Sequence, residues 1–107
     1  MEIAPFYAEG RLTVYLRGEL DQHEAKPTVE RIERELDKFM PRDCVLDIGS
    51  LSFMDSSGIA VILCICARMK STGGRAWVQN AKSQPLKVID ISGIGRLVKI
   101  NEAEAAQ

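Results

Sequence analysis

Two adjacent serines in the stretch FMDSSGIAVILCICARMKSTGG, residues 53–74, have the types and spacing that could do chemistry. Asp55, Ser56 and Ser57 can each accept a hydrogen bond from the free N–H groups that begin a helix. A helix cap requires only one of them. Because a second hydroxyl and the following Gly58 exceed what a cap needs, the stretch also suggests a catalytic nucleophile or an acceptor for a phosphate.

Hydrolysis by one of these serines is the first alternative. A hydrolytic serine needs a base within hydrogen-bond reach, and His23 is the only histidine in the chain. The sequence contains no G-x-S-x-G turn. It also contains neither a G-x-x-x-x-G-K-[ST] nor a G-x-G-x-x-G phosphate loop. These absences disfavour an enzyme, and they leave a nucleotide site only as an unorthodox one.

Covalent attachment of a phosphate is the second alternative. A phosphate at a helix N-terminus meets free N–H donors and the positive end of the helix dipole, so the fold would tolerate it. It would add a charge of about −1.5 to −2 beside Asp55 and, if the loops are neighbours, beside Asp21. A partner surface built around a neutral serine would then be repelled. Phosphorylation could therefore change binding and preserve the fold.

The elements that must position these residues follow from the hydrophobic pattern. Apolar and polar residues alternate over 11–17, which predicts a strand with one buried face. Apolar residues then recur at three- and four-residue steps from Val29 to Phe39, which predicts an amphipathic helix with Pro27 in its first turn. Residues 44–48 predict a buried strand that ends at Gly49-Ser50, followed by a loop.

The second half of the chain continues the alternation. The apolar run predicts a helix that begins at Ser57 or Gly58 and is closed by Gly73-Gly74. A strand over 75–80, an amphipathic helix over 83–92, a terminal strand over 96–100 and a polar tail over 101–107 are expected to follow. Strands and helices that alternate in this way predict an α/β fold with parallel crossovers. The loops after the first two predicted strands, which carry Asp21 and Asp55, are then expected to flank one surface.

Length and composition limit the function further. The 107 residues predict one domain over 1–107, with its core at about 11–100. The net charge of −1 and the dispersed Lys and Arg predict no nucleic-acid surface, and no run is apolar enough for a membrane span, so we expect a cytoplasmic protein. The odd count of cysteines argues against disulfides, and Cys44, Cys64 and Cys66 are expected to be small buried hydrophobes. One histidine excludes a multi-histidine metal site.

Three segments together resemble a known family: GELDQHEA, DIGSLSFMDSSGIAVIL and GGRAWVQNAKSQPLKVIDISGIGRLVKI. They are similar to the anti-sigma factor antagonists of bacteria, which are single STAS domains, and look closest to the sporulation antagonists of sigma F. The likeness extends from about Arg11 to Ile100, and its specific part is the DSSG core between apolar flanks. Glu24 and Lys26-Pro27 depart from the family pattern, which leaves the start of the first helix open.

The resemblance implies a mixed sheet of four to five strands with helices packed on it. It implies that the unphosphorylated antagonist binds an anti-sigma factor, which is also a serine kinase, and so frees a sigma factor. Phosphorylation by that kinase with ATP would switch the antagonist off, and a metal-dependent phosphatase would reset it. The family's acceptor serine maps to Ser57, with Ser56 as the cap, and Asp21, Asp55 and Gly58 would join the partner surface. No cofactor or metal is implied.

Other functions share these features. A STAS domain can instead serve as a scaffold of the stressosome type or as the soluble subunit of a lipid transporter. The rival from the enzyme class is weak nucleotide binding or hydrolysis, for which the sequence offers no phosphate loop.

Overall fold

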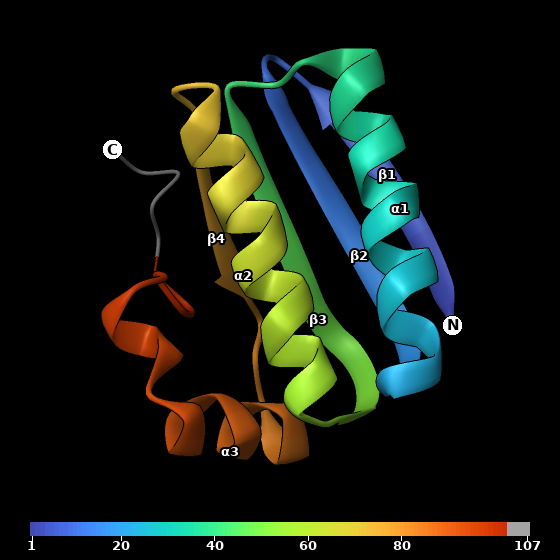
Figure 1. The fold of residues 1–107 in the computed structure, drawn as a ribbon, viewed down its shortest axis with the longest axis vertical. Coiled ribbons are helices and arrows are strands. Elements are labelled where there is room, and N and C mark those ends of the chain that lie inside the picture. Colours follow the sequence, from blue (N-terminus) through green and yellow to red (C-terminus); the bar gives the residue numbers. More distant parts are fainter. Residues whose placement is uncertain (103–107) are drawn as a thin grey trace.

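Four strands form one mixed sheet, and two long helices cover one of its faces (Figure 1). The computed structural model describes residues 1–102, so the predicted polar tail lies outside the described residues from residue 103 onward. In chain order the elements are β1 (Glu2–Ala8), β2 (Arg11–Leu20), α1 (Gln22–Phe39), β3 (Asp43–Met54), α2 (Ser56–Ser71), β4 (Arg75–Gln79), α3 (Ser83–Ser92) and the 3-10 turn η1 (Ile94–Arg96). The predicted α/β class and mixed sheet are confirmed.

The sheet has the order β1-β2-β3-β4. β1 and β2 pair antiparallel through a tight turn at Glu9 and Gly10, whose φ angles are 52° and 81°. β2, β3 and β4 run parallel, in the register Leu12 with Cys44 and Cys44 with Ala76. The helices α1 and α2 are the crossovers that parallel pairing requires. The predicted neighbourhood of the first two sequence-derived strands is therefore confirmed.

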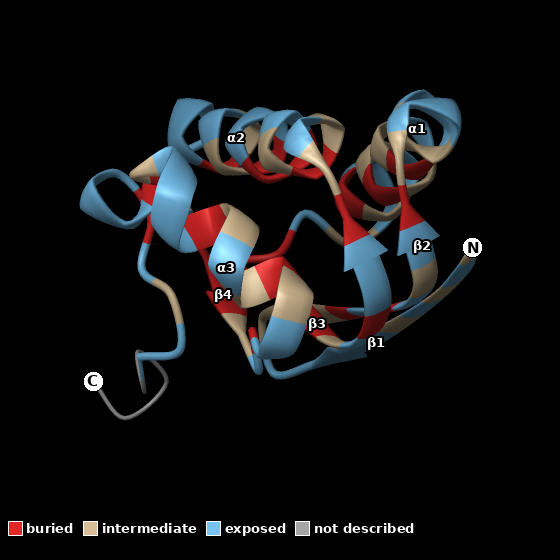
Figure 2. Ribbon diagram, turned by 90° about the horizontal axis from the view of Figure 1, so that it is seen from below, coloured by how far each residue is buried: buried red, intermediate tan, exposed pale blue. Residues whose placement is uncertain are grey.

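The core lies between the sheet and the helices α1 and α2 (Figure 2). Alternate residues of β2 and β3 point into it, and each helix contributes one apolar stripe. Its most buried members include Leu12, Val14, Leu16, Ile32, Leu46, Ile48, Ile62 and Ile65. Cys44 belongs to this core, and burial raises the pKa of its thiol to about 12. Cys66 is half-buried and Cys64 is exposed, so the expectation of three buried cysteines was wrong for Cys64.

Two strand predictions need correction. The strand β1 was not predicted, because it is an edge strand that pairs with β2 through its backbone and none of its residues is fully buried. The terminal strand predicted over 96–100 is wrong. Arg96 lies in η1, and of the described residues that follow only Ile100 bridges to β4, opposite Val78. The Val78 N–H donates to the Lys99 carbonyl oxygen at 3.0 Å.

Element boundaries also differ from those predicted. β3 continues past Gly49 to Met54, because two register shifts in its pairing with β2 let both strands extend to the same edge. α1 begins at Gln22, so Pro27 lies inside the helix, at an exposed position, and not in its first turn. α2 begins at Ser56 and is followed, as expected, by a left-handed Gly73 with φ 80°.

Gly58 allows α2 to begin close to the ends of β2 and β3. A Cβ at this position would lie 2.2 Å from Cγ of Met54 and 3.3 Å from Cδ2 of Leu20. Both of these side chains are almost fully buried, at 0% and 1% exposure, so they have little room to move. A glycine in the first turn of α2 is therefore a packing requirement, although its φ is ordinary.

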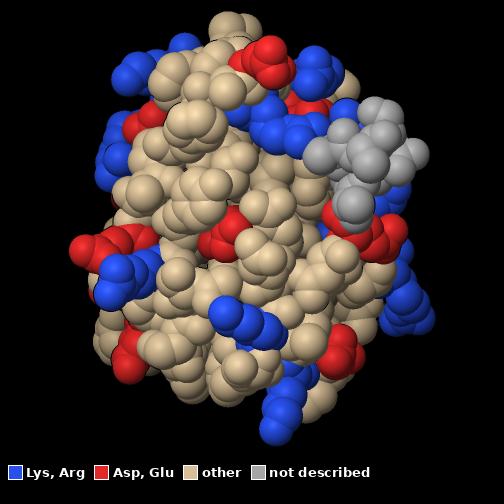
Figure 3. Space-filling model, turned by 180° about the vertical axis from the view of Figure 1, so that it is seen from behind, with Lys and Arg blue, Asp and Glu red and all other residues tan. Residues whose placement is uncertain are grey.

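The face of the sheet opposite α1 and α2 carries an ionic cluster at the end where β2, β3 and β4 begin. Asp43 is completely buried, and its carboxylate accepts from Arg11 Nη2 at 3.1 Å, Arg42 Nη2 at 3.2 Å and Arg75 Nε at 3.1 Å. Arg11 and Arg75 also lie over the ring of Trp77. Figure 3 shows this face as largely uncharged, with Lys and Arg side chains at that end and also along the sides and at the opposite end. Burial raises the pKa of Asp43, but the three arginine hydrogen bonds outweigh burial and lower it.

We expect Asp43→Asn to reduce the free energy of unfolding by about 2 kcal/mol at neutral pH, because three guanidinium groups lose their common anion. Since the pKa of Asp43 is lowered in the folded state, its contribution is complete above the ordinary value of 3.8 and disappears as pH falls through the lowered value. Urea denaturation across this pH range measures the effect. The control is Asp90→Asn, at an exposed carboxylate of α3, and an equal loss in both variants would contradict the prediction.

We expect Gly58→Ala to cost about 1–2 kcal/mol net, because the overlap with Met54 exceeds the gain of about 1 kcal/mol in helix propensity. Gly95→Ala is the matched control, since a Cβ at Gly95 would meet no atom within 4 Å. Urea denaturation of both variants is the measurement. A fully stable Gly58→Ala variant would show that α2 can stand further from the sheet.

Candidate functional site

The serine loop, residues 55–57, lies at the end of the sheet where β2 and β3 both finish. The parallel register pairs Leu20 with Met54, the last residues of the two strands. The residues that follow are Asp21 and Asp55, and the Asp55 N–H donates to the Leu20 carbonyl oxygen at 3.3 Å. The structure therefore brings the two predicted loops side by side.

Asp21 and Asp55 each cap the helix that follows. Asp55 is the N-cap of α2, and its Oδ1 accepts from the Ser57 N–H at 2.8 Å. Asp21 is the N-cap of α1, and its Oδ1 accepts from the N–H groups of His23 at 2.9 Å and Glu24 at 3.1 Å. The expectation that Ser56 is the cap was wrong, because Asp55 takes that position and Ser56 becomes the first residue of the helix.

The two serine hydroxyls remain available to other molecules. Ser56 is exposed and Ser57 is half-buried. Within residues 1–102, neither hydroxyl makes a hydrogen bond. His23 is exposed in the first turn of α1, and no hydrogen bond joins its side chain to either serine. The geometry therefore places two free hydroxyls at a helix N-terminus, a position that suits an anion, and within residues 1–102 neither is hydrogen-bonded to the base that a hydrolytic serine requires.

The outer face of α2 extends from this loop and carries little charge. Its exposed positions from Ser56 onward are Ala60, Leu63, Cys64 and Ala67, before the first lysine at Lys70. The neighbouring Arg68 is directed to α1, where it pairs with Glu33 and Asp37. Phe53, 38% exposed, precedes the loop. An uncharged helix face beside two serine hydroxyls is a surface suited to a protein partner.

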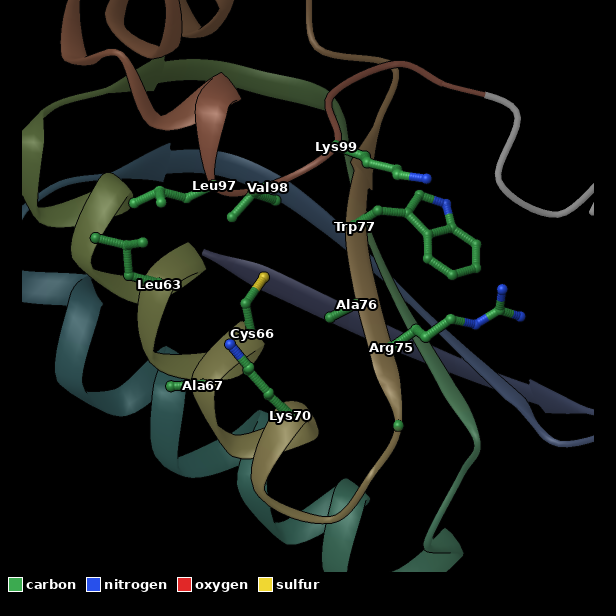
Figure 4. A pocket seen from close by; sticks show the side chains of 11 residues that line it. Leu63, Cys66, Ala67, Lys70, Arg75, Ala76, Trp77, Leu97, Val98 and Lys99 are labelled. Atoms are coloured by element: carbon green, nitrogen blue, oxygen red, sulfur yellow. The ribbon is translucent and has the colours of Figure 1, made fainter.

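A groove of about 440 Å³ lies further along α2, between that helix, β4 and the segment after η1 (Figure 4). Its walls are mainly apolar and come from Leu63, Cys66, Ala76, Leu97 and Val98. Neither serine lines it. The groove and the serine loop are therefore separate features.

Over residues 1–102, no three His, Cys, Asp or Glu side chains are grouped so that they could hold a metal ion. In the same part of the chain, no helix combines the length and apolar character that crossing a membrane demands.

Gln84, in the first turn of α3, is a residue at this site that sequence reasoning missed. Its Oε1 accepts from the Met54 N–H at 2.9 Å, and its Nε2 donates to the Met54 carbonyl oxygen at 2.9 Å. The contact joins residues 30 positions apart, and the local sequence SQPLK shows only the start of an amphipathic helix. No local signal could have found it.

Comparison with known proteins identifies the family of this chain. Residues 7–106 match the STAS domain. The chain is 29% identical over 104 residues to the anti-sigma F factor antagonist of Paenibacillus polymyxa, covering 97% of this chain and 89% of the relative. It is 31% identical over 87 residues to the anti-sigma F factor antagonist of Lysinibacillus sphaericus, covering 79% of this chain and 74% of the relative.

Solved structures agree in fold. The unphosphorylated form of the anti-sigma factor antagonist SpoIIAA superimposes with a TM-score of 0.79 at 24% identity, covering 98% of this chain and 92% of SpoIIAA. An anti-sigma factor antagonist of Thermotoga maritima, described as putative, superimposes with a TM-score of 0.85 at 19% identity, covering 97% of this chain and 89% of the other. The sequence matches and the arrangement of β2, β3 and α2 thus lead to one conclusion: the chain belongs to the STAS domain family, among the anti-sigma factor antagonists.

Proposed function

We propose that this chain acts by partner switching in the cytoplasm. In the unphosphorylated form it binds an anti-sigma factor that is also a serine kinase, and the sigma factor held by that kinase is released. The kinase transfers phosphate from ATP to Ser57, which ends the binding. A metal-dependent serine phosphatase removes the phosphate and restores the active form. The chain itself is a substrate and a binding protein, without catalytic activity or cofactor.

The position of Ser57 is the observation that carries this proposal. Its backbone N–H is held by Asp55 at 2.8 Å, so the start of α2 is ordered, while its hydroxyl has no hydrogen-bond partner within residues 1–102. In the transfer, Ser57 Oγ forms a bond to the γ-phosphorus of ATP and the bond from that phosphorus to the bridging oxygen breaks. ADP leaves, and the hydroxyl proton passes to a base of the kinase. An ordered backbone with a free hydroxyl suits this displacement.

The electrostatics of the loop support a switch in binding. The phosphate would add about −1.5 to −2 charges at a helix N-terminus, where free N–H groups tolerate an anion. Two capping carboxylates already lie at this edge, on Asp21 and Asp55. A partner surface that complements a neutral hydroxyl between two carboxylates would meet roughly twice the negative charge after modification. The fold is preserved and the interface is lost.

The partner surface in this proposal consists of Asp21, Asp55, Ser56 and Ser57, together with the uncharged outer face of α2. Gly58, which the sequence also assigned to this surface, is buried against Met54 and Leu20 and supports the loop from within. Leu63, which is 39% exposed, gives the outer face of α2 apolar contact area, and Phe53, which is 38% exposed, lies two residues before Asp55. The capping carboxylates give it a polar border. This combination of apolar centre and charged border is common in protein interfaces.

We expect Ser57→Ala to abolish incorporation of phosphate from ATP by a purified anti-sigma factor kinase of the same organism, because the acceptor oxygen is removed. Ser56→Ala should only slow the transfer, since Ser56 is exposed and its side chain makes no hydrogen bond within residues 1–102. Radiolabel incorporation gives the rates, and mass spectrometry locates the phosphate. A phosphate found on Ser56 in the wild-type chain would refute the assignment.

We expect Asp21→Asn to keep the stability of the wild-type chain within about 0.5 kcal/mol, because asparagine is an equally good N-cap. Binding to the anti-sigma factor or phosphorylation by it should nevertheless weaken, because a charge leaves the recognition surface. Titration calorimetry and thermal unfolding separate the two effects, with Asp90→Asn on α3 as the control for charge alone. Wild-type binding and phosphorylation in Asp21→Asn would restrict Asp21 to its role as a cap.

A further inference from the structure

β3 is longer than its neighbour β4, and this leaves its last part without a strand on one side. β4 ends at Gln79, which is registered with Asp47, whereas β3 continues for seven more residues to Met54. On the other side β2 accompanies β3 to the end, with Leu20 opposite Met54. The backbone of Met54 therefore needs a partner from elsewhere, since Met54 is fully buried and water cannot supply one.

The side chain of Gln84 supplies that partner. Its carboxamide accepts from the Met54 N–H and donates to the Met54 carbonyl oxygen, both at 2.9 Å. These are the two hydrogen bonds that a neighbouring strand would make. Gln84 is half-buried and belongs to the first turn of α3. A side chain thus replaces a strand at the residue that directly precedes Asp55.

The start of α3 depends on contacts of this kind. Its N-cap residue, Lys82, makes no side-chain capping bond, and Ser83 has a left-handed φ of 55°. Asn101 binds Ala81, the residue before Lys82, in the same manner. Its Oδ1 accepts from the Ala81 N–H at 2.7 Å, and its Nδ2 donates to the Ala81 carbonyl oxygen at 2.8 Å. Two carboxamide pairs therefore attach the connection between β4 and α3 to the rest of the fold. Of the two, only the pair made by Gln84 reaches the serine loop.

We propose that Gln84 is the positioning residue of the serine loop. By fixing both backbone groups of Met54, it sets the point from which Asp55, Ser56 and Ser57 leave the sheet and α2 begins. This inference rests on the proposed function of Ser57, because it assigns Gln84 a part in presenting that hydroxyl to a kinase. The partner is a carboxamide for a chemical reason: only an amide offers a donor and an acceptor side by side at neutral pH.

Removal of the carboxamide should loosen this loop and not the sheet. In Gln84→Met the side chain keeps a similar length and loses both hydrogen bonds, which leaves a buried N–H and a buried carbonyl group unpaired. Local opening that brings water to Met54 then becomes the way to satisfy them. The centre of β3, at Val45 and Leu46, is paired on both sides by strands and should be unaffected.

Amide hydrogen exchange of the isolated chain tests this directly. We expect Gln84→Met to accelerate exchange by about tenfold or more at residues 54–58, with little change at Val45 and Leu46. The matched control is Gln79→Met, which removes another glutamine hydrogen bond, to Asp47 at 2.9 Å, on the short strand β4. The control should leave exchange at residues 54–58 at the wild-type rate. An equal acceleration throughout the sheet in Gln84→Met, or none at the loop, would overturn the proposal.

The Gln84→Glu variant gives a pH-dependent result that a general loss of packing would not produce. An ionised carboxylate can accept from the Met54 N–H but repels its carbonyl oxygen, whereas the protonated acid can make both bonds. The introduced carboxyl should therefore have a raised pKa. Loop protection, relative to the wild-type chain at the same pH, should recover between about pH 7 and about pH 5. Protection that does not change with pH would contradict the two-bond role.

Phosphorylation supplies the functional reading. With the anti-sigma kinase and ATP, the rate of transfer to Ser57 should fall about tenfold in Gln84→Met and stay unchanged in Gln79→Met. A wild-type rate in Gln84→Met would overturn the positioning role even if exchange at the loop had increased. Failure of the wild-type chain to be phosphorylated would instead refute the proposed function, and hydrogen exchange would still decide whether Gln84 holds the loop.

Discussion

The parallel pairing of β2 with β3 is the constraint on which the rest of this structure depends. Because the two strands run in the same direction and end at Leu20 and Met54, their following loops emerge side by side. The residue after each strand is an aspartate, and each aspartate caps the helix that follows. If the two strands were antiparallel, these two loops would lie at opposite ends of the strand pair. The meeting of Asp21, Asp55 and Ser57 is thus a consequence of topology.

The two ends of the parallel sheet handle carboxylates in opposite ways. Where the strands begin, the buried Asp43 is surrounded by three arginines, whose hydrogen bonds lower its pKa below the ordinary value. Where the strands end, Asp21 and Asp55 are paired with backbone N–H groups at helix N-termini. At the first end the ion pairs of Asp43 hold the strands together, and the carboxylate has its partners within the fold. The second end leaves carboxylate oxygens and serine hydroxyls near the surface, where a partner can reach them.

Sequence patterns predicted the elements that follow periodic rules and missed those that depend on distant contacts. Alternation over 11–17 and the apolar run after Gly58 gave a strand and a helix because each buries one continuous face. β1 escaped detection because an edge strand with Pro5 needs little apolar alternation. Residues 96–100 have the composition of a strand, yet the chain is turning there through η1. Adjacency of the two aspartate loops was predictable from topology, whereas the bond from Gln84 to Met54 was not, since it joins distant parts of the chain.

The proposed switch requires that one surface change its charge and that its backbone stay in place, and α2 is built to meet both demands. Its inner face is fixed against the sheet by Val61, Ile62 and Ile65, and its first turn is fixed by Asp55, Gly58 and the pairing of Met54 with Gln84. Its outer face is nearly uncharged, so a phosphate at Ser57 would dominate the local potential. A partner would then respond to charge and not to a rearranged helix. Order at the start of α2 is what would allow a single modified oxygen to decide binding.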